Sequence, residues 1–303
     1  MKTASILRAL ALLLICLLPA LPVRAADALR SAYRSGVSTT LSASVGAFNS
    51  VLGHAANGYG QVRLTDKGFF LATPGSSRAP RMWWAFEARE YHGDTKGRKF
   101  DMLLGFEKPL GVRTRLGFAT GYGVADLDTG REIRSRTLSF APYLQTKLND
   151  NLGFKAWAAL ARPDYRLGST PRAAWRTAAG LDASGAYKLR TLDLSGTAGL
   201  SMSRQASSGV GDVSGWQVGK LTATLRTRAT LRLERNFRPY FELGYSYGAW
   251  VDAGSSGDYE TPSLKTGLSW THKKRSFTLN LNGTQVFDPV QPLVLSTNYS
   301  IRF

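Results

Sequence analysis

The chain has 303 residues, of which 43% are hydrophobic and 20% charged, and its formal net charge is +18. Beyond its N-terminal segment it contains no apolar run of about 18 residues or more, which is what a membrane-spanning helix needs. A basic excess of this size points to nucleic acid, anionic lipid or an anionic solute as partner, or to positive charge that lines an interior.

The N-terminal segment has the pattern of a secretory signal peptide, residues 1–25. Two basic residues precede an apolar core at 9–20, and Val23 and Ala25 put small residues at positions −3 and −1 of a cleavage site. We expect cleavage after Ala25. A retained anchor helix fits less well, because two prolines interrupt a segment already too short to span a bilayer.

Removal of this segment changes both the cysteine content and the charge. It takes away Cys16, the only cysteine, so the mature chain can form no disulfide. It also carries three basic residues and no acid, so the net charge falls from +18 to about +15. Export argues against nucleic acid as the partner, and without disulfides the fold must rest on backbone hydrogen bonds and packing.

A weakly amphipathic helix is expected near residues 37–58. Phe48, Val51 and Leu52 fall near one side of this helix, and Ser, Asn and His fall near the other. Several small residues would let the helix lie close to a wall. A periplasmic arm or a disordered tail is the alternative. The stretch 60–81 that follows contains possible short strands to which we assign no role.

From Met82 onward, apolar and polar residues alternate with a period of two. In the clearest case, Leu and Ala occupy one face, and the other carries an arginine row that consists of Arg226, Arg228 and Arg232. This alternation is typical of strands, because a period of 3.6 would scatter the arginines around a helix. It predicts about twelve strands, near 82–92, 99–108, 112–126, 132–147, 152–163, 172–188, 190–203, 213–233, 238–252, 260–271, 275–286 and 292–303.

These strands predict an all-β fold, a transmembrane antiparallel up-and-down β-barrel at 82–303 that follows an N-terminal arm at 26–81. Tight turns after even-numbered strands and longer loops rich in Gly, Asp and Ser after odd-numbered ones are typical of bacterial outer-membrane barrels. Lipid satisfies no backbone hydrogen bond, so a sheet in the membrane must close on itself. A soluble all-β domain is the alternative, but it would have to hide both an apolar and a charged face.

The two faces of the expected strands would have different surroundings. The polar faces, including the arginine row, would line the lumen. The apolar faces would contact outer-membrane lipids and lipopolysaccharide, with aromatic side chains at the two membrane interfaces. The aromatic residues expected there are Trp83, Trp84, Phe106, Tyr245, Tyr247, Trp250, Trp270 and Phe303.

The last predicted strand carries Tyr299, Ile301 and Phe303 on its apolar face. We expect it to close the barrel by pairing with the first predicted strand near Trp84 and Phe86. A terminal aromatic residue preceded by apolar residues two apart resembles the signal that the outer-membrane barrel assembly machinery recognises. A strand that ends on Phe by chance is the alternative.

Four segments of the chain match the pattern of one outer-membrane family. WWAFEAREYHGD would be the first strand, LGFATGYGVADLD the third and YSIRF the last, and VGAFNSVLGHAANGYGQ precedes them. Together they resemble the translocator β-domain of autotransporters, the type V secretion proteins. The resemblance implies a barrel of about twelve strands, an N-terminal helix that threads the lumen, and a passenger delivered to the cell surface or anchored there.

The chain departs from this family in two respects. About 56 residues separate the expected cleavage site from Met82, enough for a helix and a short arm but not for a large passenger. The adjacent asparagines at which some family members cut themselves are absent, since Asn49 and Asn57 are isolated. We therefore expect a passenger-poor, monomeric barrel that anchors or translocates a short N-terminal segment at the cell surface.

Two alternatives remain: a narrow anion-favouring outer-membrane channel, and an outer-leaflet lipid-modifying enzyme. The channel rests on the arginine row, since like charges repel cations at close quarters; the row could also dock the helix or form a solvated wall. The enzyme lacks support, because His92 and His272 fall at opposite ends of the barrel and His54 lies in the helix. We expect no catalytic residue, no metal site and no cofactor.

Overall fold

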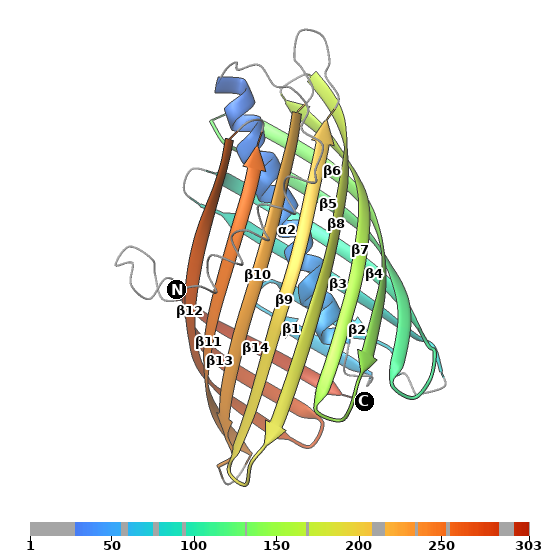
Figure 1. The fold of residues 1–303 in the computed structure, drawn as a ribbon, viewed down its shortest axis with the longest axis vertical. Coiled ribbons are helices and arrows are strands. Elements are labelled where there is room, and N and C mark those ends of the chain that lie inside the picture. Colours follow the sequence, from blue (N-terminus) through green and yellow to red (C-terminus); the bar gives the residue numbers. More distant parts are fainter. Residues whose placement is uncertain are drawn as a thin grey trace, which may run out of the picture.

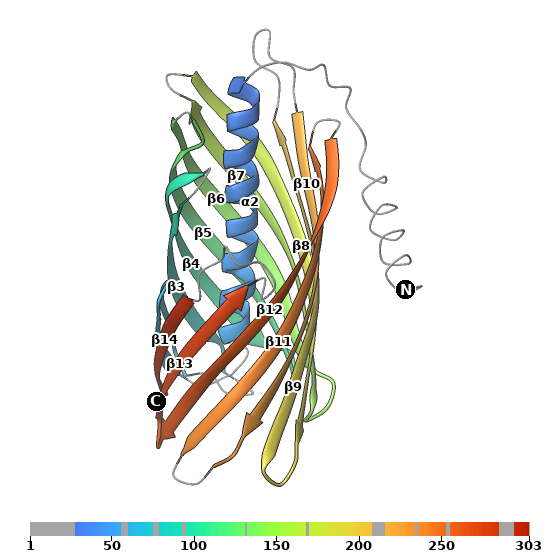
Figure 2. The same cartoon turned by 90° about the vertical axis from the view of Figure 1, so that its left-hand side faces the viewer.

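The structure is a computed structural model in which a helix lies inside a β-barrel (Figures 1 and 2). It describes residues 28–55, 60–74, 79–92, 95–130, 132–167, 170–207, 216–233, 236–252, 255–284 and 294–302. The predicted signal peptide and Phe303 lie outside the described residues. Within these ranges, no helix combines the length and the apolar character that crossing a membrane requires.

Within these ranges, fourteen antiparallel strands form a closed sheet in chain order around the barrel, and the last strand pairs with the first. The helix is α2 (Ala28–Ala55). The strands are β1 (Gln61–Thr65), β2 (Gly68–Ala72), β3 (Arg81–Tyr91), β4 (Lys96–Pro109), β5 (Thr114–Asp128), β6 (Glu132–Lys147), β7 (Leu152–Leu167), β8 (Thr170–Lys188), β9 (Leu192–Ser207), β10 (Trp216–Leu231), β11 (Phe237–Asp252), β12 (Ser255–His272), β13 (Arg275–Thr284) and β14 (Val294–Arg302).

The barrel has two more strands than the sequence predicted. The additional pair is the β1–β2 hairpin, which lies between the helix and the first predicted strand. Each of its strands has five residues, which is too short for alternation to be told from chance. The barrel wall therefore begins at Gln61, and α2 begins at Ala28 rather than near residue 37.

The hairpin also changes how the barrel closes. Ile301 pairs with Val62 and Tyr299 with Leu64, both on β1. The predicted closing pair was wrong, because Trp84 and Phe86 pair instead with β2. Two short strands are thus inserted between the ends that were expected to meet.

Gly68 makes the tight turn of this hairpin possible. Its φ of +149° belongs to a region that side chains with a Cβ rarely adopt. A Cβ atom at this position would lie 1.9 Å from the carbonyl oxygen of Phe86 on β3. Only glycine lets β2 approach β3 so closely at the turn.

The helix begins at one rim of the barrel, and the last strand ends at the opposite rim. Odd-numbered strands run toward the rim where α2 begins, which we call the helix-start rim, and even-numbered strands run toward the rim where β14 ends (Figure 2). Loops at the helix-start rim were predicted to be the longer ones. Eight residues separate β9 from β10 and nine separate β13 from β14, whereas only two residues separate β7 from β8 and β11 from β12, because β7, β8 and β12 extend further than predicted.

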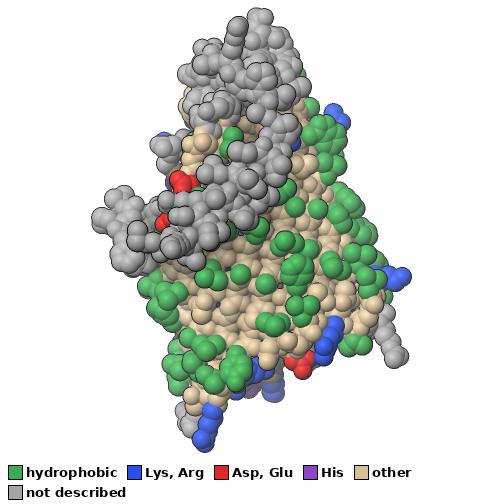
Figure 3. Space-filling view, in the orientation of Figure 1, with side chains coloured by type: hydrophobic (Ala, Val, Ile, Leu, Met, Phe, Trp, Pro, Cys, Tyr) green, Lys and Arg blue, Asp and Glu red, His purple; other side chains and the backbone are tan. Residues whose placement is uncertain are grey.

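The outer wall is apolar. Met82, Trp84 and Phe100 are exposed, and hydrophobic side chains are spread over the visible wall, with charged ones mostly toward its upper and lower ends (Figure 3). Such a wall suits hydrocarbon, because the paired backbone leaves few polar groups facing outward. The interfacial prediction was wrong for Trp83 and Trp250, which face the lumen. Trp83 is 1% exposed, because its neighbours at 82 and 84 take the outward positions, and Trp250 pairs with Lys220, whose side chain bonds to α2.

The lumen has two unlike halves. The apolar half, formed by inward-facing positions of β2–β8, contains most of the buried hydrophobic residues. The polar half, formed by inward-facing positions of β9–β14, is lined mainly by Ser, Thr, Asn, Arg and Lys. A helix with one apolar side therefore has one favourable wall to pack against.

Candidate functional site: the seat of the lumen helix

The lower part of α2 packs into an apolar cluster on the wall. Phe48 is 4% exposed and stacks on Trp157, with ring centroids 6.2 Å apart and planes 13° from parallel. Val51 and Leu52 are buried in the same cluster, whose other members are Ala47, Phe70, Ala72, Trp83, Ala85, Leu103, Ala119, Ala141, Tyr143 and Ala178. Burial of these side chains and their aromatic contacts favours a docked helix.

Large aromatic rings shape this cluster by lying over small residues of neighbouring strands. The ring of Trp157 covers Gly180, where a Cβ atom would lie 2.5 Å from the indole nitrogen. Trp83 donates its indole N–H to the hydroxyl of Tyr143 at 2.8 Å, which satisfies a polar atom inside the apolar half. The wall therefore presents a rigid surface to α2.

The upper part of α2 packs against a second cluster nearer the helix-start rim. Val37 and Leu41 of the helix are at most 1% exposed there. Their partners on the wall are Ala125, Leu127, Ile133, Tyr165, Ala174 and Val218. The two clusters hold the helix along most of its described length.

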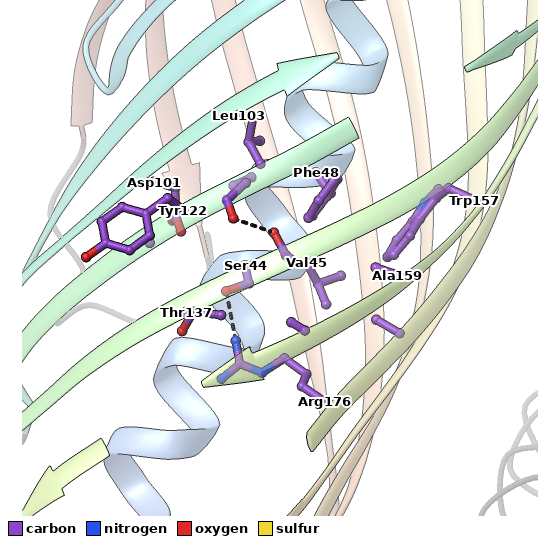
Figure 4. Close-up of a pocket in the computed structure, with 16 residues that line it drawn as sticks. Ser44, Val45, Phe48, Asp101, Leu103, Tyr122, Thr137, Trp157, Ala159 and Arg176 are labelled. Atoms are coloured by element: carbon purple, nitrogen blue, oxygen red, sulfur yellow. Dashed lines mark hydrogen bonds between the residues drawn. The ribbon is translucent and has the colours of Figure 1, made fainter. Parts of the chain in front are cut away.

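Between the two clusters, Arg176 of β8 binds the helix directly. Its guanidinium donates to the Thr40 carbonyl at 3.3 Å, the Thr40 hydroxyl at 3.0 Å and the Ser44 hydroxyl at 2.8 Å. It also donates to Tyr165 at 3.0 Å and to Gln205 at 2.8 and 3.0 Å. Figure 4 shows the bond to Ser44 from the strand to the helix.

The environment of Arg176 is unusual for a charge. Arg176 is 3% exposed, and no acidic residue of the described chain forms an ion pair with it. Buried charge is costly unless hydrogen bonds satisfy it, and here neutral oxygens of the helix and two strands do so. The side chain therefore gains its full set of partners only when α2 is in place.

Two further side chains hold α2 from other directions. Gln145 of β6 donates to the carbonyl of Leu52 at 3.1 Å, near the end of the helix. Lys220 of β10 donates to the hydroxyl of Ser42 at 3.0 Å from the polar half, and its ammonium lies 5.1 Å from the ring centre of Tyr259. The helix is thus bonded to strands on both sides of the lumen.

Two cavities of different volume lie beside α2, one on each side of the lumen. On the apolar side, a cavity of about 30 Å³ remains beside Ser44, Phe48 and Trp157 (Figure 4). On the polar side, a cavity of about 200 Å³ is lined by residues that include Ser42, Ser201 and Thr224. The first holds about one water, whereas the second has room for several and has polar partners for them.

The structure separates the members of the predicted arginine row. Arg228 pairs with Glu242 at 2.5 Å, and Arg232 pairs with Asp193 just beyond the end of β10. Arg226 faces the lumen, is exposed there, and forms no ion pair within the described residues. Among the described side chains, none of the three arginines bonds to α2, so these contacts do not support docking of the helix by the row.

Other predicted positions lie as follows. Tyr299 and Ile301 are on the outward face of β14. His92 follows β3 at the helix-start rim, and His272 ends β12 at the opposite rim, where it stacks on Trp270. The side chain of His54 is outside the described residues. The described residues contain no group of three or more His, Cys, Asp or Glu side chains arranged to hold a metal.

Arg176 was not singled out from the sequence. A weak indication existed, because small residues, Ala174 and Ala178, flank it on the inward face of its strand. Arg226 and Arg228 also face inward on their strand, so the alternation pattern could not distinguish Arg176 from them.

A family model for the autotransporter β-domain matches residues 83–284, which is more than half of the chain. The chain belongs to the autotransporter β-domain family. It is an outer-membrane autotransporter barrel, and the resemblance noted in its strands is confirmed.

Comparison with solved structures finds similar barrels in two autotransporters. The β-domain of the Bordetella autotransporter BrkA is 14% identical, with a TM-score of 0.51, and the match covers 82% of this chain and 99% of that one. The translocator domain of the autotransporter NalP from Neisseria meningitidis is 12% identical, with a TM-score of 0.49, over 90% of this chain and 96% of that one. No curated protein matches the chain in sequence.

Proposed function

We propose that this autotransporter barrel retains α2 as a plug and so anchors a short N-terminal segment, which includes the start of that helix, at the cell surface. The observation that carries the proposal is the hydrogen bonding of Arg176, which binds the helix to the wall at mid-lumen. A helix in transit would need few specific bonds, whereas this one is held by apolar clusters and by three polar side chains.

The direction of the helix supports this orientation. An even number of strands places the free ends of β1 and β14 at the same rim, which in outer-membrane barrels faces the periplasm. The start of α2 lies at the other rim (Figure 2). The N-terminal end of α2 would therefore lie on the outer side of the membrane.

The signal peptide would be cleaved after Ala25, which places the start of α2 soon after the new N-terminus. Outer-membrane lipids and lipopolysaccharide would contact the apolar wall, and the barrel assembly machinery would recognise β14. The barrel would act as a monomer and without catalysis.

An epitope inserted between Asp27 and Ala28 should be accessible to antibody on intact cells, because α2 delivers that point to the helix-start rim. The matched control is the same epitope inserted at Arg190, in the β8–β9 turn at the opposite rim. The control should react only after the outer membrane is permeabilised. Protection of the first epitope on intact cells would disprove the proposed orientation.

Phe303→Ser should lower the amount of assembled barrel in the outer membrane, because it removes the terminal aromatic residue of the proposed assembly signal. Heat-modifiable migration on gels measures the folded fraction. The control is Phe277→Ser, which removes an outward-facing aromatic residue that pairs with Tyr299 on the neighbouring strand. Equal losses in both variants would show that the terminal position has no special role.

A further inference from the structure

The polar half of the lumen contains a group of basic side chains that the plug does not use. Arg226 and Arg228 are neighbours on the inward face of β10, and Arg228, Glu242 and Lys265 lie directly across from one another on β10, β11 and β12. Arg63 extends from β1 close enough to Arg228 and Lys265 for the like charges to repel. We call Arg63, Arg226, Arg228 and Lys265 the basic group.

The basic group has little opposing charge. Glu242 binds Arg228 at 2.5 and 2.7 Å and also faces Lys265 across the strands. Within the described part of the chain, Arg63, Arg226 and Lys265 form no salt bridge. Four cations and one carboxylate leave a local charge of about +3 inside the barrel.

The basic group is also held in fixed positions. Its members come from strands β1, β10 and β12, whose backbones are paired on both sides at these residues. Arg228 is fixed further by the ring of Tyr240, whose centre lies 4.3 Å from the guanidinium carbon. Cations fixed by a scaffold do not have to be gathered when a ligand arrives, which favours binding.

The surroundings of the basic group are wet and polar. Arg226 is exposed to the lumen although it lies inside the barrel. Hydroxyl and amide side chains occupy adjacent inward positions, with Thr197 and Thr224 beside Arg226 and Asn282 beside Lys265. These groups could complete the hydrogen bonds of an anion that the cations attract.

We propose that the basic group is a binding site for a small soluble oxyanion with two or more negative charges, of the phosphate or pyrophosphate type. Guanidinium and ammonium groups together suit the several oxygens of such an anion. One multivalent anion can replace several monovalent counterions, and the protein walls strengthen the field that attracts it.

The chemistry of the wall argues for a free anion rather than a lipid headgroup. The cations face the lumen, and at their level β10, β11, β12 and β13 are joined by continuous backbone pairing. The outward face of those strands is apolar, with Leu243 and Tyr245 exposed. A headgroup whose chains stay in the bilayer could not reach the basic group through this wall.

The test is calorimetric titration of the full-length protein, folded in detergent, with inorganic pyrophosphate at constant ionic strength set by chloride. Wild type should show saturable binding near one equivalent. Arg226→Gln combined with Lys265→Gln should weaken that binding roughly 10- to 100-fold, because two of the direct charges are lost. Heat-modifiable migration would verify that the variant is folded.

The control variant is Lys188→Gln combined with Arg190→Gln. It removes two positive charges at the rim, one at the end of β8 and one in the β8–β9 turn. It should keep the wild-type affinity. An absence of saturable binding in wild type, or an equal loss in both double variants, would overturn the proposal. The outcome does not depend on whether the chain before Ala28 reaches the cell surface.

Discussion

Arg176→Met should release α2 from the lumen wall and turn a plugged barrel into a conducting one. The substitution keeps the length of the side chain but removes the bonds to Thr40, Ser44, Tyr165 and Gln205. Each hydrogen bond to a charged group contributes about 1.5–3 kcal/mol, and because the contributions are not additive we expect docking of the helix to weaken by roughly 3–5 kcal/mol. The fraction of time spent unplugged would then rise roughly a hundredfold or more.

Single-channel recording in planar bilayers measures this effect directly, as frequent and longer openings of the variant. Arg226→Met is the matched control, since it removes the same charge from the inward face but has no bond to α2. The control should remain as closed as wild type. If both variants conducted equally, the loss of charge rather than the release of the helix would explain the current.

Gly68→Val should prevent closure of the barrel, and we expect the largest loss of folded protein from this single change. A Cβ at this position would lie 1.9 Å from the backbone oxygen of Phe86, and the φ of +149° disfavours a β-branched residue. Backbone strain of this kind costs on the order of 1–3 kcal/mol before the steric clash is counted. The β1–β2 hairpin would be displaced from β3, and the sheet would then be open between β3 and β14.

The folded fraction is measured by heat-modifiable migration and by the yield in outer-membrane fractions. Gly111→Val in the β4–β5 turn is the control, because no atom lies within 4 Å of a Cβ placed there. That variant should assemble normally. Normal assembly of Gly68→Val would show that the hairpin is not needed to close the barrel.

The long strands could be predicted from the sequence, and the short ones could not. Alternation over 15 or more residues, as in β5 and β10, leaves one arrangement that buries one face and exposes the other. The five-residue strands β1 and β2 have no such statistical weight. They become strands because β3 and β14 each present an unpaired edge that the bilayer would not tolerate.

At the candidate site, the sequence could not show which inward-facing arginine binds the helix. Arg176 and Arg226 both occupy inward positions on long strands, and nothing in the local sequence separates them. One is buried and bonded to the helix, and the other is exposed to the lumen, because α2 packs off-centre against the apolar half. The position of α2 depends on Trp83, Tyr143 and Trp157, which come from three different strands.

By itself the sequence determined the class of fold, the inward and outward faces of the long strands and the family pattern, because each follows from a period-two repeat that a membrane barrel enforces along every strand. Only the tertiary structure decided the strand number, the closing pair, which lumen half receives α2 and which arginine holds it. These depend on contacts between residues far apart in the chain, such as Thr40 with Arg176 and Val62 with Ile301, which no local pattern records.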